Sequence, residues 1–338
     1  MPHAPRRILL TGGAGFIGCN LVRLLLTAEP GCRIVDLDSL TYAGSRENLR
    51  DLPDPDRHRL VEGDICDAGL VDTLFREHAI DTVIHCAAES HVDRSISGPA
   101  AFIQTNLVGT FTLLEAARRH WLGEGEKRED VRFHHISTDE VYGTLRADDP
   151  AFSETTPYRP NSPYSASKAG SDHLVRAYHH TYGLPVTTSN CSNNYGPFQH
   201  QEKFIPTVIR ACLHQQPIPV YGDGSNIRDW LYVEDHCRGI HTVLTRGRLG
   251  ETYNIGGDNE WANIHIVRHI CRLFDARFPA RAPHEGLIGF VSDRPGHDWR
   301  YAINASKIRR ELAWQPHEDF VSGIARTVDW YLAQPTKE

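Results

Sequence analysis

The first half of the chain alternates short apolar runs with longer helical stretches. The apolar runs, rich in β-branched residues, predict strands at residues 7–11, 33–38, 59–63, 82–86, 132–137 and 186–190. Helices are expected between them at 16–28, 67–78, 99–121 and 163–182. This alternation implies right-handed crossovers and a parallel sheet that is covered on both faces. The pattern therefore predicts an α/β fold with a Rossmann-type doubly wound parallel sheet.

The pattern changes after residue 195. Four prolines and two glycines between residues 197 and 224 divide this part into shorter elements, and helices are expected at 204–215, 234–246, 262–275 and 320–333. Neither a Gly/Ser-rich nor a Pro-rich tract separates the halves, so a flexible linker is not expected. We expect a first domain over residues 1–195 and a smaller α/β C-terminal lobe over 196–338.

Composition and charge narrow the class of protein. The 338 residues are 40% hydrophobic and 23% charged, which is ordinary for a globular protein, and the net charge of −7 disfavours nucleic acid as a partner. The apolar runs are far shorter than the roughly 20 residues that span a bilayer, and the N-terminus has no apolar region of a signal peptide. We expect a cytoplasmic protein without a membrane partner.

Cysteine and histidine spacing gives no sign of a metal or disulfide site. The eight cysteines include no C-x-x-C pair, and the 20 histidines form no H-E-x-x-H motif. The neighbours His134 and His135 should point to opposite faces of their strand. No metal is therefore expected.

A glycine-rich turn follows the first predicted strand and opens a helix. Gly12, Gly15 and Gly18 stand three residues apart, in a spacing variant of the dinucleotide-binding fingerprint. An acid follows at the end of the second strand, either Asp36 or Asp38, and Asp38 stands 20 residues after Gly18. A carboxylate there would bind the adenosine ribose and repel a 2′-phosphate. This favours NAD over NADP, bound at the carboxyl edge of the sheet by the first domain.

Two groups of polar residues are candidates for catalysis. Ser162 suits a helix N-cap, and Tyr164 and Lys168 then share one helix face, where an ammonium should lower the tyrosine pKa. Asp139 and Glu140 follow the fifth strand, which should open onto the same cleft. Two carboxyl groups in different environments could act as acid and base in a dehydration.

These motifs resemble a known family. The Tyr164/Lys168 pair together with the glycine turn is similar to the short-chain dehydrogenase/reductase superfamily, whose extended branch handles nucleotide sugars. Six further motifs resemble the dTDP-glucose 4,6-dehydratases: S-T-D-E-V-Y-G at 137–143, A-A-E-S-H-V-D-R-S at 87–95, N-N-Y-G-P at 193–197, E-K at 202–203, R-D-W at 228–230 and R-P-G-H at 294–297. The match runs from about Arg6 to Tyr331.

The resemblance implies a redox-neutral reaction of dTDP-glucose in three stages. Tyr164, assisted by Lys168, takes the proton of the 4-hydroxyl while a hydride passes from C4 to NAD. Glu140 then removes the proton at C5, and Asp139 protonates the C6 hydroxyl so that water leaves. The hydride returns to C6 and gives dTDP-4-keto-6-deoxyglucose, with Thr138 hydrogen-bonded to the 4-oxygen. The resemblance also implies a permanently bound NAD and a homodimer formed through the helices at 99–121 and 163–182.

The family pattern assigns binding residues by position. For NAD it gives Gly12, Gly15, Phe16, Ile17, Gly18, Asp38, Ser39, Asp64, Ile65, Ala87, Ala88, Thr105, Tyr164, Lys168 and Asn194. For the nucleotide sugar it gives Ser90, Thr138, Asn193, Lys203, Phe204, Tyr221, Arg228, Asn263, Arg294 and His297. Arg228 and Arg294 also suit a diphosphate on chemical grounds, since guanidinium groups are planar and permanently charged.

Three alternative functions remain open at this point. An epimerase or decarboxylase of the same superfamily would share the glycine turn, Tyr164 and Lys168, but epimerisation would not need the acid and base pair of Asp139 and Glu140. A 4,6-dehydratase of UDP- or GDP-linked sugars would differ in few base contacts. A non-catalytic NAD-binding regulator could lose all four of these side chains, whereas this chain keeps them. The residues favour dehydration.

Overall fold

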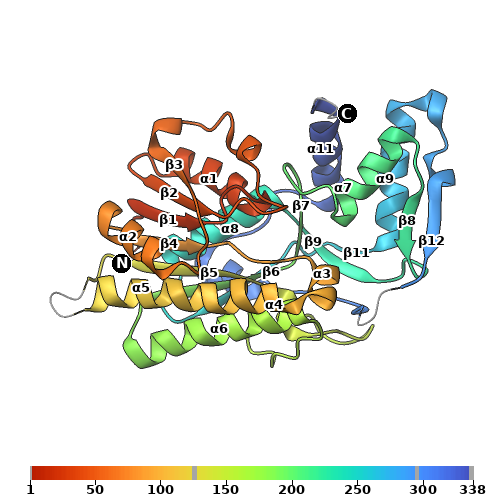
Figure 1. Ribbon diagram of the computed structural model, residues 1–338. Coiled ribbons are helices and arrows are strands. Elements are labelled where there is room, and N and C mark those ends of the chain that lie inside the picture. The colour runs from red at the N-terminus through yellow and green to blue at the C-terminus, as the bar shows by residue number, and fades with distance from the viewer. Residues whose placement is uncertain (1, 124–127, 294–296, 335–338) are drawn as a thin grey trace.

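The largest feature of the fold is a parallel sheet of seven strands. The computed structural model describes residues 2–123, 128–293 and 297–334 (Figure 1). The strand order is β10-β6-β5-β4-β1-β2-β3, and every neighbouring pair is parallel. The strands are β1 (Arg7–Thr11), β2 (Arg33–Asp38), β3 (His58–Glu62), β4 (Thr82–His85), β5 (Arg132–Thr138), β6 (Val186–Cys191) and β10 (Thr252–Ile255).

Helices cover both faces of this sheet. One face carries α1 (Phe16–Ala28), α8 (Val233–Arg246) and α10 (Ser306–Leu312), and the other carries α2 (Ala68–His78), α5 (Thr110–Leu122) and α6 (Pro163–Tyr182). Along β1, Ile8 and Leu10 pack into the core beneath α1 and α8, whereas Leu9 packs on the side of α2 and α5. Burial on both faces explains why the strands are continuous apolar runs.

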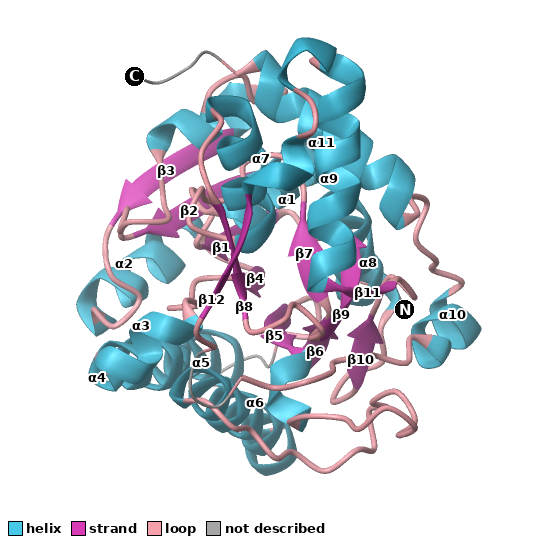
Figure 2. Cartoon of the chain, turned by 90° about the vertical axis from the view of Figure 1, so that its right-hand side faces the viewer, coloured by secondary structure: helices cyan, strands magenta, loops and turns pink. Residues whose placement is uncertain are grey.

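A smaller lobe lies beyond the carboxyl edge of the sheet (Figures 1 and 2). Its three-stranded sheet has the order β11-β9-β7, and two further strands, β8 and β12, pair in parallel. Tyr195, Trp230, Phe274 and Phe320 belong to its core. Its elements are β7 (Asn193–Tyr195), α7 (Phe204–His214), β8 (Ile218–Tyr221), β9 (Ile227–Tyr232), β11 (Glu260–Ala262), α9 (Asn263–Arg277), β12 (Ile288–Val291) and α11 (Phe320–Ala333).

The doubly wound sheet expected from the sequence is confirmed, and two details differ. The expected helix at 99–121 is divided into α4 (Pro99–Phe102), a π-helical segment η3 (Ile103–Gly109) and α5, after a short α3 (Val92–Ser97). In addition, α8 and β10 return from the second half of the chain to the large sheet. The division at residue 195 stays a prediction. The large sheet and its helices, however, also include α8 and β10, which lie within the range 196–338 expected for the smaller lobe.

Two further observations concern the described part of the chain. None of its helices combines the length and the apolar character needed to cross a membrane. Within the same ranges, no three His, Cys, Asp or Glu side chains are placed to hold a metal ion. The eight cysteines are all free thiols.

Candidate active site

The glycine-rich turn lies where the strand order of the large sheet reverses. It follows β1, and Ala87 follows the adjacent strand β4. Gly12 has φ of +77°, and a Cβ there would lie 2.7 Å from the Cα of Ala87. A Cβ on Gly18 would overlap the carbonyl oxygen of Gly12. These positions therefore need glycine, and the turn leads directly into the N-terminus of α1, which favours an anionic group such as a pyrophosphate.

Two buried acids at the end of β2 hold this turn in place. Asp36 Oδ1 accepts a hydrogen bond from the Gly13 amide at 2.9 Å, and Asp38 Oδ2 accepts one from the Ala14 amide at 2.9 Å. Asp38 Oδ1 also accepts from the amide of Leu40, and Asp38 alone of the two acids lines the adjacent cavity. Of the two candidates from the sequence, the structure thus places Asp38 where a ribose could reach it.

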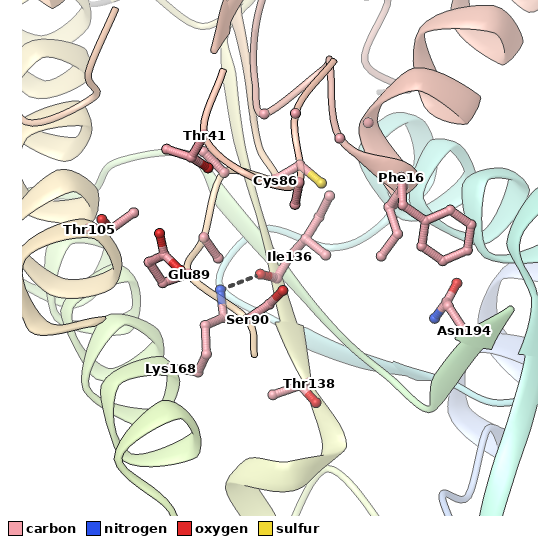
Figure 3. Close-up of a pocket in the computed structure, with 18 of the residues that line it drawn as sticks. Phe16, Thr41, Cys86, Glu89, Ser90, Thr105, Ile136, Thr138, Lys168 and Asn194 are labelled. Atoms are coloured by element: carbon pink, nitrogen blue, oxygen red, sulfur yellow. Dashed lines mark hydrogen bonds between the residues drawn. The ribbon is translucent and has the colours of Figure 1, made fainter. Parts of the chain in front are cut away.

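A cavity of about 410 Å³ opens over the turn and the carboxyl ends of the strands. It is lined by every residue that the sequence assigned to NAD: Gly12, Gly15, Phe16, Ile17, Gly18, Asp38, Ser39, Asp64, Ile65, Ala87, Ala88, Thr105, Tyr164, Lys168 and Asn194. Figure 3 shows Lys168 and Thr138 below the cavity and Phe16 and Asn194 at its side. The size and the glycine cradle suit a dinucleotide.

Thr138, Asp139 and Glu140 stand together where β5 ends. The strand passes directly into a 3₁₀ turn, η4 (Asp139–Tyr142), whose N-cap is Thr138: its hydroxyl accepts from the Glu140 amide at 3.3 Å. Asp139 is only 1% exposed, and burial raises its pKa well above the ordinary value, with Glu140 and Asp229 adding to the effect. Glu140 is half-buried. The two carboxyl groups therefore have different environments, which is the condition for using them as acid and base.

Helix α6 carries Tyr164 and Lys168 into the same cavity. Ser162 caps the helix in a capping box with Ser165, as predicted for an N-cap. The expectation that the pKa of Tyr164 is lowered is wrong: burial, and then Glu140, raise it well above its ordinary value. The Lys168 ammonium instead donates to the carbonyl oxygen of Ile136 at 2.7 Å (Figure 3). Tyr164 is therefore a neutral phenol in this environment.

A second cavity of about 350 Å³ lies between the sheet and the smaller lobe. Eight of the residues assigned to the nucleotide sugar line it: Ser90, Asn193, Lys203, Phe204, Tyr221, Arg228, Asn263 and His297. Thr138 lines the first cavity, and Arg294 lies outside the described residues. The two cavities share six lining residues: Ser90, Glu140, Asn193, Asn194, Gln199 and Lys203. Of these, Glu140 is a candidate catalytic residue, and the other four candidates line the first cavity.

The guanidinium of Arg228 is held by several contacts. Its guanidinium donates to the carbonyl oxygens of Ile227, Trp299 and Asp298 at 2.7, 3.2 and 2.8 Å, and it stacks on the Tyr301 ring at 4.3 Å. The group is thus rigidly positioned at the cavity wall. A fixed guanidinium would offer an anionic ligand a preorganised contact.

Sequence reasoning missed several residues of the two cavities. Cys86 and Glu89 follow β4 beside the predicted Ala87 and Ala88, so their position at the strand end could have identified them. Gln199 and His200 come from the loop before α7, which no regular pattern marks. Glu202, in the same loop, belongs to the E-K motif at 202–203 but was not assigned to the site. These loop residues reach the site only because the lobe folds back against the sheet.

Comparisons with known proteins agree with this geometry. A sequence model of the GDP-mannose 4,6 dehydratase family matches residues 9–327. A dTDP-glucose 4,6-dehydratase of Xanthomonas campestris pv. campestris (strain B100) is 59% identical over 331 residues, which cover 97% of this chain and 93% of the relative.

Solved structures of dehydratases and epimerases are similar to this fold to nearly the same degree, but they differ in sequence identity to the chain. A dTDP-glucose 4,6-dehydratase from Streptomyces venezuelae, solved with NAD bound, superposes with a TM-score of 0.88 at 47% identity, covering 96% of this chain and 97% of that one. A UDP-glucose 4-epimerase from Thermus thermophilus superposes nearly as well, with a TM-score of 0.85, but at 29% identity over 97% of this chain and 100% of that one. The fold is shared with epimerases, whereas sequence identity is higher to the dehydratases. The chain belongs to the dTDP-glucose 4,6-dehydratase family.

Proposed function

We propose that the two cavities bind NAD and dTDP-glucose and that the chain converts dTDP-glucose to dTDP-4-keto-6-deoxyglucose. The observation that carries this proposal is the meeting of the two cavities at Glu140, beside Thr138, Asp139, Tyr164 and Lys168. An oxidising cofactor in the first cavity and a sugar in the second would then share one set of acid and base groups. The high identity to dTDP-glucose 4,6-dehydratases over nearly the whole chain supports the choice of substrate.

The first cavity fits NAD on three grounds. The glycine turn would let a pyrophosphate approach the backbone, Asp38 would bind the ribose, and Lys168 and Tyr164 line the same cavity. Bound NAD would supply the hydride acceptor and donor of the reaction, and the positive charge of its nicotinamide would favour a phenolate at Tyr164. A carboxylate at Asp38 would disfavour NADP.

Residues at the start of α6 would carry out the oxidation at C4. We assign Tyr164 as the base that takes the proton of the 4-hydroxyl, with the positive charge of Lys168 stabilising its phenolate. Thr138, whose hydroxyl lies at the end of β5, would donate a hydrogen bond to the 4-oxygen. The 4-ketone that results makes the neighbouring C5 proton acidic.

Asp139 and Glu140 would carry out the elimination of water. Burial keeps the pKa of Asp139 well above its ordinary value, which favours a protonated carboxyl that can donate a proton to the C6 oxygen. Glu140, half-buried and in contact with both cavities, would remove the C5 proton. An epimerase has no step that requires this pair, so their presence favours dehydration over epimerisation.

A substrate panel tests the proposal. The purified protein would be incubated without added NAD with dTDP-, UDP- or GDP-glucose, and products would be identified by mass spectrometry. Loss of one water from dTDP-glucose, faster than from the other two, is expected. Faster dehydration of UDP- or GDP-glucose would reject the proposed substrate, and an unchanged mass with all three, even after NAD is added, would reject the activity.

We also propose that the chain forms a homodimer through the region of α5 and α6. Five large apolar side chains on α3, η3, α5 and α6 are exposed: Ile96, Ile103, Val108, Phe111 and Tyr182. Such a concentration is typical of a protein interface. The cytoplasmic location, and the absence of nucleic-acid and membrane partners, stay predictions from the sequence.

A further inference from the structure

A buried carboxylate lies on α6 one turn after Lys168. Asp172 is 6% exposed and Lys168 4% exposed. Residues four apart share one face of a helix, so both side chains point towards the sheet. Burying a carboxylate is costly unless it is paired and hydrogen-bonded, and no step of the proposed reaction uses this group directly. Its role is therefore to be sought in its partners.

Three donors hold the carboxylate in one orientation. Asp172 Oδ1 accepts from His135 Nε2 at 2.9 Å, and Oδ2 accepts from the Ser137 hydroxyl at 2.8 Å and the Tyr158 hydroxyl at 2.9 Å. His135 and Ser137 stand on β5, and Tyr158 stands on the segment before α6. Because a carboxylate only accepts hydrogen bonds, all three contacts favour its ionised form.

Burial favours the neutral form of four other ionisable groups around this pair. Burial lowers the pKa of His85 and His135 well below their ordinary value. Burial also raises the pKa of the Cys86 thiol to about 12 and raises that of Cys191. His173, the remaining neighbour on α6, acts on Asp172 less strongly than Lys168 does. The carboxylate and the ammonium are thus the principal charges in this part of the core.

For both Lys168 and Asp172, burial disfavours the charged form, and the charge of the other group favours it. Burial lowers the pKa of Lys168, and Asp172 is the strongest influence in the other direction, ahead of the two thiols. Burial raises the pKa of Asp172 to about 6, and Lys168 is the strongest opposing influence. Above about pH 6 the carboxylate is therefore charged. The Lys168 ammonium binds the carbonyl oxygen of Ile136, which lies on β5 between the two residues, His135 and Ser137, that bind Asp172.

We propose that Asp172 is a positioning residue for the reaction: its carboxylate, fixed by His135, Ser137 and Tyr158, keeps Lys168 positively charged inside the core. This inference rests on the proposed function, in which that charge stabilises the Tyr164 phenolate. The burial that raises the pKa of Tyr164 makes the lysine charge more important. Asp172 would act only through Lys168 and would not touch the substrate.

The protonation of Lys168 can be followed directly by NMR. The chain has five lysines, so ¹³C labelling of the lysine side chains gives few signals: Lys127, Lys168, Lys203, Lys307 and Lys337. In the holoenzyme, a Lys168→Arg variant assigns the signal of Lys168 by its disappearance. We expect the titration midpoint of Lys168 to fall by about one pH unit or more in Asp172→Asn, since a nearby opposite charge shifts a pKa by roughly 1–3 units.

A matched variant separates charge from packing. Tyr158→Phe removes one donor but keeps the carboxylate, and it should leave the Lys168 midpoint within about 0.3 units of the wild type, well below the shift expected for a lost charge. Asp172→Glu keeps the charge and should recover most of the shift. Midpoints that are equal in Asp172→Asn and the wild type would overturn the proposal, whatever the activity of the variants.

The pH profile of the reaction gives a second readout. In Asp172→Asn, the loss of kcat at alkaline pH should begin about one unit lower than in the wild type, because Lys168 loses its proton earlier. A uniform loss of kcat at every pH would show a structural role only and contradict the proposal. If the wild type does not act on dTDP-glucose, the proposed function fails, whereas the NMR titration still decides whether Asp172 controls Lys168.

Discussion

At the scale of single residues, burial decides how the two adjacent carboxyl groups behave. Asp139 lies in the protein interior, and its Oδ2 has no hydrogen-bond partner among the described residues. Glu140, one residue further, lines both cavities. Asp139, whose environment favours the protonated carboxyl, is thus the direct neighbour in sequence of Glu140, which lines the proposed sugar cavity. Such an arrangement suits proton removal and proton donation in one step.

The buried acid should cost stability. The folded protein binds the Asp139 proton more tightly than the unfolded chain, because the pKa is raised in the fold. Stability therefore falls as the pH rises from about 4 through the folded pKa, and the full deficit is present above it. Asp139→Asn should raise the free energy of unfolding near pH 8 by on the order of 1–3 kcal/mol and leave it unchanged near pH 4. Urea unfolding at both pH values measures this, and an equal change at both would contradict it.

Glu140 should be needed for elimination but not for the fold. Glu140→Gln keeps the shape of the side chain and removes the base, so kcat should fall by about 10²–10⁴-fold. Exchange of the C5 hydrogen with deuterated water should be lost to the same extent, as mass spectrometry of recovered sugar would show. Retained exchange would assign the base to another residue. The melting temperature should stay close to that of the wild type.

At the scale of elements, the turn between β1 and α1 depends on close packing of backbone. In Gly18→Ala the added methyl group would overlap the carbonyl oxygen of Gly12, so the turn must open. We expect the purified variant to carry more than about tenfold less NAD per chain than the wild type. Gly31→Ala is the matched control, because a Cβ there has no atom within 4 Å. Equal NAD contents in the two variants, measured after heat release, would argue against the proposed cradle.

The long elements of the fold could be predicted from the sequence because each carries its own signal. β1, α1 and α6 begin and end as expected, since apolar runs, the glycine turn and the capping residue Ser162 mark them locally. The strands β7 and β11 have three residues each, and their pairing with β9 joins distant parts of the chain. No local pattern marks such strands.

In the site, too, residues in local motifs could be predicted, whereas contacts between distant parts of the chain could not. The residues assigned to NAD all line one cavity, because the motifs that carry them stand at strand ends and meet at one edge. Asp172 could be seen as the residue four after Lys168, but its hydrogen bonds to His135, Ser137 and Tyr158 appear only once β5 and α6 are packed. The pKa of Tyr164 was wrongly predicted for the same reason, since burial is a property of the fold.

At the scale of the whole molecule, the exposed apolar side chains near α5 and α6 predict the dimer interface. Phe111 is 47% exposed, and Phe111→Glu would place a charge in that interface. Light scattering after gel filtration should show a monomer for this variant and a dimer for the wild type. Val321 on α11 is 50% exposed outside this region, so Val321→Glu should remain dimeric. A dimer in both variants would locate the interface elsewhere.

The path of the hydride from C4 to C6 tests the proposed reaction most directly. The enzyme would be given dTDP-glucose that carries deuterium at C4, in ordinary water and without added NAD. If one cofactor remains bound between the two cavities, the deuterium should leave C4 and appear at C6 of the keto sugar that has lost one water. Deuterium that returns to C4 without loss of water would identify an epimerase, and deuterium lost from the sugar would contradict an internal transfer by bound NAD.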